Sequence, residues 1–480
     1  MAERYWIETL GCPKNQVDSD KLVGTLVADG YEAAGTPEQA DLVVVNTCAF
    51  IEAARQESVD TVLALADTRR DGARLVVTGC MAERYGHELA EAIPEVDLVA
   101  PFGVPLTGTS APATALSDPV SPAATPVLLG RKPAPSDGPA VPSFDLLNLP
   151  RPPSTAPWSY IKVAEGCDRN CGFCAIPSFR GKQRSRTTRS ILDEVGQLGG
   201  PDGRLREVVL VAQDLSSFAL DRSTGRTEPR LDGPAVGGSR PIVDLVEAVA
   251  RRVAWVRLLY LYPSTLDDAL VEAILATGVP YFDLSLQHVS RPLLKRMRRW
   301  GEGERFLDRI ASIRAAEPTA AFRSSFIVGY PGETEADHDL LLEWLSAAQL
   351  DWVGFFPFSN EVGTHAAGLP DQIDADLVAE RLRECTEIQD AITARRRDEL
   401  LGSTVDVLVD HPGEGRTYRE APEIDGIVSV PVDLPVGSFA AVVVTGADGP
   451  DLVAEPVPGA GTPGVRPGAR PLVSPVGTAR

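Results

Sequence analysis

Three cysteines stand close together in the middle of the chain, at Cys167, Cys171 and Cys174, directly after a strand-like run. Their C-x3-C-x2-C spacing places three thiols on one tight loop. Three thiolates can bind three irons of a cubane iron–sulfur cluster and leave the fourth iron without a protein ligand. Such an open metal position is typical of a catalytic site. The alternative is a zinc knuckle, which fits less well because structural zinc takes four ligands and no further His or Cys stands close by. We call these three residues the loop triad.

A second set of cysteines, Cys12, Cys48 and Cys80, is spread along the first hundred residues. Each follows one of three expected strands, and the loops after parallel strands gather along one edge of a sheet. The three thiols of this sheet-edge triad are therefore able to converge on a second cluster with an open position. Their spacings of 36 and 32 residues form no local motif, so three unrelated buried cysteines remain an equal alternative. We interpret Cys385, within a long expected helix, as a packing residue.

The composition is that of a globular protein, since 44% of the 480 residues are apolar and 24% are charged. The length suggests about three domains. A net charge of −21 argues against a protein that coats nucleic acid with a basic surface, and it favours a basic partner. The chain has no apolar run of about 18 residues and no signal-peptide layout at its start, so we expect a soluble, cytoplasmic protein with reduced thiols.

Residues 1–104 alternate short β-rich runs with amphipathic stretches, which predicts a parallel α/β domain that would position the sheet-edge triad. The expected strands are residues 5–10, 41–46 and 74–78. Residues 105–157 contain 13 prolines in 53 positions, and we expect a flexible Pro/Ala-rich linker there.

Residues 158–401 return to a β/α alternation. The expected strands are residues 160–164, 207–212, 256–261, 281–286, 322–329 and 352–358. The helices expected between them are residues 191–198, 242–251, 267–276, 304–316 and 334–348. Six such units predict an open or partial barrel of parallel strands, with the active site at the carboxyl ends of the strands. A loop at 223–240 is expected as a surface insertion, and a helix at 374–401 leads out of the domain.

Residues 402–458 have short alternating runs punctuated by Gly and Pro, which predict a small all-β barrel. This module has ten acidic residues and only two basic ones, Arg416 and Arg419. Residues 459–480 are expected to be disordered. The whole chain is therefore predicted to be of the α/β class, with a small all-β module near its end.

Several runs resemble known families. The run GCDRNCGFC at 166–174 resembles the signature of radical S-adenosylmethionine (SAM) enzymes. The runs LGCPKNQVDS at 10–19 and VNTCAFI at 45–51 resemble the N-terminal domain of methylthiotransferases, and residues 402–458 resemble a TRAM domain. The resemblance covers about residues 3–100 and 158–458. It thus implies an N-terminal methylthiotransferase domain, a (βα)6 radical SAM barrel and a TRAM-like module.

Within the methylthiotransferases, four runs are most similar to the RimO branch: GCPKN at 11–15, AEGC at 164–167, AIPSFRG at 175–181 and APEIDG at 421–426. That branch modifies an aspartate of ribosomal protein S twelve. The resemblance implies a [4Fe–4S] cluster on the loop triad that binds SAM and generates a 5′-deoxyadenosyl radical. It further implies an auxiliary [4Fe–4S] cluster on the sheet-edge triad that presents sulfur, with the methyl group coming from a second SAM.

The implied partners are the basic ribosomal protein, free or within the small subunit, and an electron donor such as flavodoxin or ferredoxin. No membrane and no stable nucleic-acid binding are expected. Polar residues at or near the ends of expected strands are candidates for cofactor contact, although each is also explained as a strand-end cap. These residues are Gln213, Asp214, Ser285, Gln287 and Arg323. We assign no catalytic residue beyond the cluster ligands.

Two further features have alternative interpretations. His288 is interpreted as a structural imidazole. The basic stretch at 180–186 is either a solvated loop or a contact for the target aspartate or for ribosomal RNA.

Two rival functions differ in what they predict. A MiaB-type enzyme would modify an adenosine of transfer RNA with the same clusters, but its TRAM domain should offer a cationic surface, whereas residues 402–458 are strongly acidic. The acidic module favours a basic protein substrate. A non-catalytic, metal-binding ribosome-associated scaffold would bind metal without turnover.

Overall fold

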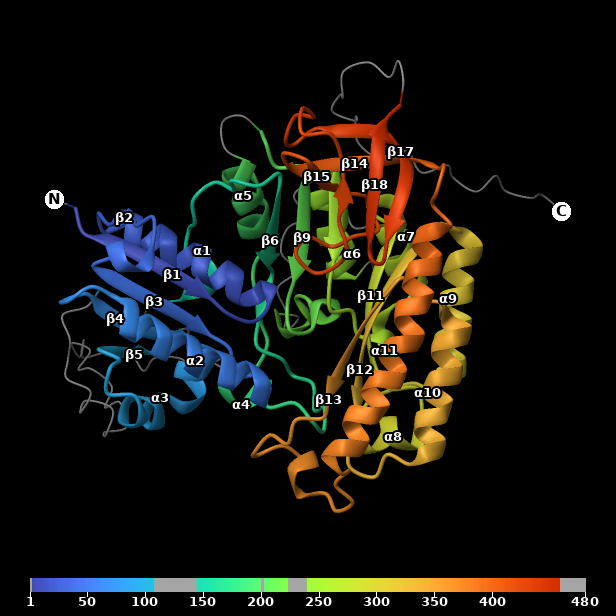
Figure 1. The fold of residues 1–480 in the computed structure, drawn as a ribbon, viewed down its shortest axis with the longest axis horizontal. Helices are drawn as coiled ribbons and strands as arrows, with labels where there is room; N and C mark the ends of the chain where they lie inside the picture. Colours follow the sequence, from blue (N-terminus) through green and yellow to red (C-terminus); the bar gives the residue numbers. More distant parts are fainter. Residues whose placement is uncertain (1, 108–144, 200–202, 223–239, 458–480) are drawn as a thin grey trace, which may run out of the picture. The chain divides into compact units, whose positions relative to one another are not determined.

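A computed structural model describes residues 2–107, 145–199, 203–222 and 240–457 (Figure 1). Chain contacts divide it into two compact units. The first holds Met1–Pro152 and Ile176–Lys182, and the second holds Pro153–Ala175 and Gln183–Arg480.

Some expectations fall outside the described residues. Nearly all of the expected insertion at 223–240, the whole tail at 459–480 and most of the linker at 105–157 lie there. The described part of the linker up to residue 152 packs within the first unit. A short 3-10 helix, η3 (Leu146–Asn148), buries two leucines there, and Lys21 donates a hydrogen bond to the carbonyl of Leu147 at 2.5 Å.

The first unit is built on a five-stranded parallel sheet in the order β2-β1-β3-β4-β5. Its strands are β1 (Arg4–Thr9), β2 (Glu32–Ala33), β3 (Leu42–Thr47), β4 (Arg74–Gly79) and β5 (Leu98–Ala100). All six residues of β3 are buried, as expected for a central parallel strand that is covered on both faces. The parallel α/β fold predicted for this part of the chain is confirmed.

Three helices of this unit each follow a strand of its sheet closely: α1 (Pro13–Ala28), α2 (Glu52–Thr68) and α3 (Cys80–Ala92). The fourth, α4 (Ile176–Arg180), comes from a later part of the chain. Helix α1 starts at a proline, which suits a first helical position because the missing N–H would have no partner there. Its Leu22 and Leu26 pack with Val44 and Val76 of the sheet. Because β1, β3 and β4 run parallel, their carboxyl ends lie at the same edge of the sheet.

The second unit contains six parallel strands in two three-stranded sheets, ordered β10-β9-β6 and β11-β12-β13. The strands are β6 (Trp158–Lys162), β9 (Glu207–Val211), β10 (Trp255–Leu258), β11 (Tyr281–Gln287), β12 (Ala321–Val328) and β13 (Trp352–Pro357). A parallel bridge between Leu261 and Leu284 joins the two sheets. The predicted partial barrel of six parallel strands is confirmed.

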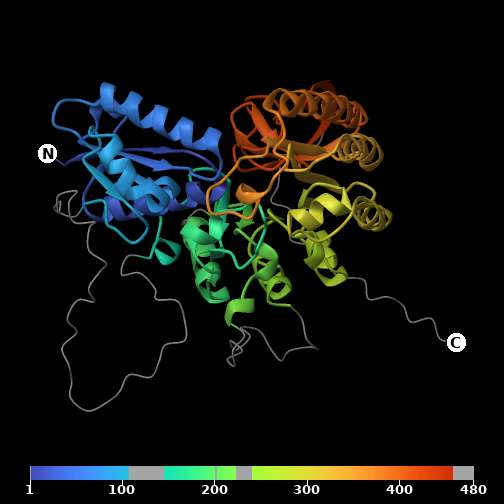
Figure 2. The ribbon, with the colours of Figure 1, turned by 90° about the horizontal axis from the view of Figure 1, so that it is seen from below.

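Helices cover the outside of these strands, as the green to orange ribbons of Figure 2 show. They are α5 (Thr188–Gly199), α6 (Pro241–Ala250), α7 (Asp268–Ala276), α8 (Arg291–Arg296), α9 (Gly303–Ala316), α10 (Glu335–Ala348) and α11 (Ala375–Asp398). A two-stranded antiparallel hairpin, β7 (Ala164–Glu165) and β8 (Arg184–Ser185), closes the base of the segment that carries the loop triad.

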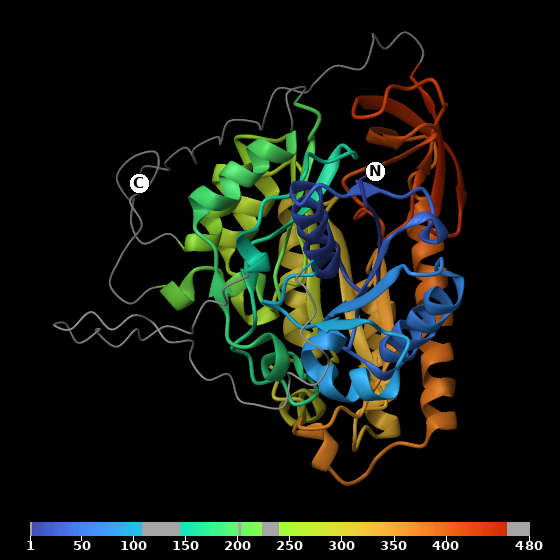
Figure 3. The ribbon, with the colours of Figure 1, turned by 90° about the vertical axis from the view of Figure 1, so that its left-hand side faces the viewer.

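Helix α11 leads to a small closed barrel, drawn in red in Figure 3. Its strands, in barrel order, are β14 (Thr404–His411), β15 (Glu414–Arg416), β16 (Val428–Ser429), β18 (Asp451–Pro456) and β17 (Phe439–Asp448). Val407, Val428, Val442 and Leu452 fill its core. The predicted all-β module is confirmed.

The small barrel packs against the amino ends of the large-barrel strands. Trp255, the first residue of β10, packs edge-on against Phe439 with ring centroids 4.9 Å apart. Tyr281, the first residue of β11, donates a hydrogen bond to Asp425 at 2.6 Å. The module therefore lies at the end of the strands opposite to their carboxyl ends. Among the described residues, no helix has both the length and the apolar character needed to cross a membrane.

Candidate active site

The sheet-edge triad lies at the carboxyl edge of the first unit's sheet. Cys12 precedes α1, Cys48 follows β3, and Cys80 is the first residue of α3. Gly11 has a φ of +97°, and a β-carbon built there would lie 3.0 Å from the Cys48 sulfur. Asn15 ties the loops together, since its side-chain amide donates to the carbonyls of Leu10 at 2.9 Å and Thr47 at 3.1 Å. The structure thus brings the three predicted cysteines together.

Arg180, from α4, lies among these residues. Its Nη2 donates hydrogen bonds to the Cys80 sulfur at 2.9 Å and to Asn15 Oδ1 at 2.8 Å, and its Nη1 pairs with Asp18 at 3.2 Å. The guanidinium also lies 4.5 Å from the ring centroid of Phe102. Only 3% of the Arg180 side chain is exposed. Sequence reasoning missed this role because its hydrogen-bond and ion-pair partners lie a hundred residues or more away along the chain.

The interpretation of the stretch at 180–186 as a solvated loop holds only in part, because Lys182 is exposed while Arg180 is buried. Within the second unit, Arg186 is likewise buried and pairs with the buried Glu194. Buried cations occur where a paired carboxylate or another acceptor compensates their desolvation. Arg180 and Arg186 thus have structural partners, which sequence spacing alone does not reveal.

The three thiols of the sheet-edge triad differ in pKa because burial and nearby charges act on them to different extents. Burial alone would raise the pKa of Cys12, but the nearby positive charges of Lys14 and Arg180 lower it below its usual value. Burial, followed by the proximity of Cys80 and Cys12, raises the pKa of Cys48 to about 12. Burial also raises the pKa of Cys80 against the opposing charge of Arg180. Arg180 therefore favours the thiolate form that a metal requires.

Replacing Arg180 with alanine is expected to destabilise the metal-free protein by about 3 kcal/mol, because breaking a buried ion pair leaves Asp18 without its cation. Chemical denaturation of both proteins measures the difference. Arg180→Lys keeps the charge and should lose less stability. A change below about 1 kcal/mol for alanine would show that the pair is not buried in solution.

The loop triad lies between β7 and α4 in the sequence. The Arg169 backbone N–H donates to the Cys167 sulfur at 3.4 Å, and Arg299 Nη1 donates to the Cys171 sulfur at 3.5 Å. Backbone hydrogen bonds of 2.8 Å from Gly172 to Met297 and from Ala366 to Gly172 hold the loop. Burial raises the pKa of Cys167 to about 11. The loop is thus fixed by its own domain before any metal binds.

Gln213 and Asp214 lie directly beyond β9, beside this loop. Gln213 Nε2 donates to Glu165 Oε1 at 2.7 Å, and Asp214 accepts a hydrogen bond from Arg169 Nε at 2.5 Å. Gln213 Oε1 and Asp214 Oδ1 are nevertheless buried without a hydrogen-bond partner among the described residues. Buried acceptors usually find a donor, so these two atoms suit the amino and hydroxyl groups of a ligand.

The other three candidates for cofactor contact lie in different surroundings. The Ser285 carbonyl accepts a hydrogen bond from Arg299, so it is near the loop triad. Gln287 ends β11 with a φ of +72°. Arg323 lies near the amino end of β12 and pairs with Asp283 at 3.1 Å and Asp425 at 3.4 Å. The structure therefore places Arg323 under the small barrel, and we leave it out of the site.

His288 is fully buried after β11 and accepts a hydrogen bond from the Ser290 backbone N–H at 3.0 Å. Burial lowers its pKa to about 4. Because the folded protein holds this imidazole neutral, the unfolded state binds a proton more readily. The free energy of unfolding is therefore unaffected above the unfolded-state pKa of about 6.5, and it falls as the pH drops from there towards 4. The surroundings fit the predicted structural imidazole.

His288→Asn keeps an acceptor for Ser290 and removes this titration. Between pH 7 and pH 5, the wild type is expected to lose about 2 kcal/mol more of its unfolding free energy than the variant. Urea denaturation at the two pH values measures this. Equal losses in the two proteins would mean that His288 is protonated in the folded state.

Cys385 of α11 is fully buried, and burial raises its pKa to about 12. Both features accord with the predicted packing role. Within the described residues, no three His, Cys, Asp or Glu side chains are grouped as they would be around a single metal ion. A cubane cluster makes a different demand, since each thiolate binds its own iron.

Three family models match successive parts of the chain. They are the uncharacterized protein family UPF0004 at residues 4–101, the radical SAM superfamily at 161–345 and the TRAM domain at 401–457.

Curated relatives match nearly the whole length. The protein named ribosomal protein uS12 methylthiotransferase RimO from Cutibacterium acnes is 40% identical over 93% of this chain and 97% of its own length. Proteins of the same name from Salinispora arenicola and Moorella thermoacetica are 41% and 40% identical, covering 94% and 92% of this chain and 95% and 96% of their own lengths. The chain belongs to the RimO family of methylthiotransferases.

The RimO family membership confirms the resemblance seen in the sequence. It makes the protein a radical SAM enzyme, which uses SAM and a [4Fe–4S] cluster. The three thiols of the loop triad and the two buried acceptors beside them fit these groups.

Proposed function

We propose that this protein adds a methylthio group to the β-carbon of an aspartate in ribosomal protein uS12. The observation that carries the proposal is the pair of cysteine triads, each one ligand short of a closed four-cysteine cluster site, in a chain 40% identical to RimO proteins over 93% of its length. The reaction must both generate a radical and deliver sulfur. Each of these steps needs a cluster with an open iron position.

The loop triad would hold the cluster that binds SAM, and the sheet-edge triad would hold an auxiliary [4Fe–4S] cluster. Bound there, these groups supply reductive cleavage of SAM and a source of sulfur. The protein's own residues hold the cofactors and exclude water, so that a radical meets substrate before solvent. Gln213 and Asp214 would accept hydrogen bonds from SAM, and Arg180 would keep the auxiliary ligands in their thiolate form.

Charge supports a basic protein as substrate. The only two basic residues of the small barrel, Arg416 and Arg419, are tied to carboxylates. Arg416 pairs with Asp410 at 2.6 Å and with Glu207 at 2.8 Å, and Arg419 pairs with Asp351 at 3.0 Å. Acidic residues such as Asp433 stay exposed on the module. Its surface therefore favours a basic protein over the phosphates of transfer RNA.

Intact-mass analysis distinguishes the two substrates. Purified uS12 and bulk transfer RNA are incubated separately and anaerobically with reconstituted enzyme, reductant and SAM. We expect a methylthio mass increase on one aspartate of uS12 and none in the nucleoside digest. An increase confined to an adenosine would move the protein to the transfer RNA branch. Metal binding without any turnover would instead favour the scaffold.

A further inference from the structure

A strongly basic patch lies on the second unit where α8 leads into α9. A cavity of about 400 Å³ is lined there by five cations, Arg291, Lys295, Arg298, Arg299 and Arg305. In a chain with a net charge of −21, this concentration of positive charge is local and opposite to the average. We call these five residues, together with Trp300, the α8–α9 patch.

The patch is not neutralised by its own surroundings. Glu302 is the one acidic residue that lines the cavity, and it pairs with Arg305 at 2.7 Å and with Arg291 at 3.5 Å. Lys295 and Arg298 are exposed and form no ion pair within the described part of the chain. Clustered cations without counterions repel one another and attract a polyanion.

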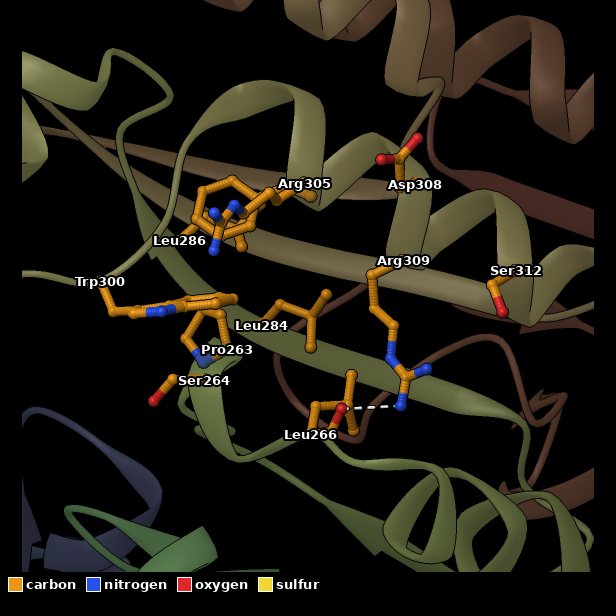
Figure 4. Close-up of a pocket in the computed structure, with 11 residues that line it drawn as sticks. Pro263, Ser264, Leu266, Leu284, Leu286, Trp300, Arg305, Asp308, Arg309 and Ser312 are labelled. Atoms are coloured by element: carbon orange, nitrogen blue, oxygen red, sulfur yellow. Dashed lines mark hydrogen bonds between the residues drawn. The ribbon is translucent and has the colours of Figure 1, made fainter.

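Trp300 adds an aromatic surface to this charge. Its side chain is 43% exposed, and it lines both this cavity and a neighbouring one of about 390 Å³. Figure 4 shows the indole between the Pro263 ring and the Arg305 side chain. Leu266, Leu284 and other apolar side chains line the second cavity. The Arg305 side chain is long, flexible and 58% exposed, so it can swing off the indole and let a flat base stack there while the phosphates meet the adjoining cations.

The patch borders the loop triad. Arg299 lines the basic cavity and also donates to the Cys171 sulfur at 3.5 Å. Its guanidinium stacks on the ring of Tyr262 at 3.9 Å. A nucleic-acid strand held on the patch would therefore lie beside the loop triad.

We propose that the α8–α9 patch binds a single-stranded segment of RNA, with phosphates on the cations and a base on Trp300. The inference rests on the proposed function and extends it: the protein substrate is recognised with the RNA that lies beside it in the small ribosomal subunit. An acidic protein would satisfy the charges, but a single-stranded nucleic acid carries a planar base beside every phosphate, which suits cations that adjoin an exposed indole. The overall acidity excludes a general RNA coat, whereas one local patch gives a defined contact.

The first test measures binding to a fluorescein-labelled, mixed-sequence RNA 12-mer by anisotropy across a salt series, with the reconstituted full chain. Arg291→Gln/Lys295→Gln is expected to weaken binding about tenfold and to reduce the salt slope by about 1.4, since each single-strand phosphate contact contributes about 0.7. Trp300→Ala is expected to weaken binding at least about fivefold with the slope unchanged, because stacking releases no ions.

The matched control is Arg251→Gln/Arg383→Gln, which removes two exposed cations elsewhere on the same unit. It should bind the RNA like the wild type. Equal weakening in the control, tight binding of oligoglutamate, or no effect of either patch variant would overturn the proposal. Competition with unlabelled small subunits and with bulk transfer RNA distinguishes the RNA source, and stronger competition by transfer RNA would overturn the ribosomal assignment.

The second test compares rates of methylthiolation. The Arg291/Lys295 variant should modify free uS12 at the wild-type rate and intact small subunits about tenfold more slowly in kcat/KM. Equal rates of wild type and variant on subunits would overturn the role of the patch. If neither protein modified uS12 in any form, the proposed function would fail, while the binding measurement would still decide the RNA site.

Discussion

Alanine at Cys171 is expected to abolish cleavage of SAM, with 5′-deoxyadenosine formation falling at least about a thousandfold. Cys171 is one of three thiols on a loop that Arg299 and the Gly172 backbone hold in place. Two remaining ligands cannot hold a cubane cluster with only one open iron. Chromatographic quantification of 5′-deoxyadenosine after anaerobic incubation with dithionite measures the loss.

Cys385→Ala provides the matched control for this experiment. Cys385 is also a buried thiol of the second unit, but it lies in α11 with no thiol partner nearby. The control should retain cleavage within about twofold even if it costs about 1 kcal/mol in stability. Near-wild-type cleavage by the Cys171 variant would rule out the loop triad as the SAM-binding site.

Replacing the whole sheet-edge triad with alanine should separate the two halves of the reaction. This variant is expected to cleave SAM within about threefold of the wild-type rate, because the loop triad and its surroundings are intact. Methylthiolated uS12 should fall at least about a thousandfold, since no thiols remain to hold the sulfur source. Parallel quantification of 5′-deoxyadenosine and of modified uS12 gives both numbers.

Continued methylthiolation by this variant would mean that sulfur is delivered without Cys12, Cys48 and Cys80. Loss of both activities together with lost secondary structure would point to a folding defect. In that case the same two products are measured for the single variant Cys48→Ser, which keeps the loop geometry around Gly11.

Most of the strands that the periodicity predicted lie within one or two residues of the observed ones, whereas short strands such as β2 and β5 were not predicted. The strand expected at 41–46 is β3 at Leu42–Thr47, and the one expected at 281–286 is β11 at Tyr281–Gln287. The strand expected at 256–261 ends earlier, at Leu258. Tyr260 there takes a φ of +66°, and only Leu261 pairs again, with β11. A left-handed residue inside an apolar run leaves no signal in hydrophobic periodicity.

The candidate site was predicted to the extent that topology determines it. Cysteines that follow parallel strands must share an edge, so the grouping of Cys12, Cys48 and Cys80 followed from the order of elements. Arg180 did not follow, because α4 comes from a distant part of the sequence and its partners are set by tertiary packing. Arg323 was proposed to contact the cofactor because it lies near the end of an expected strand, but that end is the amino end of β12, where Arg323 pairs with Asp425 of the small barrel. Alternation gives the face of a strand but not what covers its amino end.

One chain is expected to hold two separate iron–sulfur clusters, one on each cysteine triad. Mössbauer spectroscopy of protein reconstituted with ⁵⁷Fe, combined with iron and sulfide analysis, tests it in the wild type and in each triple-alanine variant. We predict about eight irons per wild-type chain in [4Fe–4S] form and about four in either variant. About four irons in the wild type, unchanged when the sheet-edge triad is removed, or zinc in place of iron, would contradict the claim.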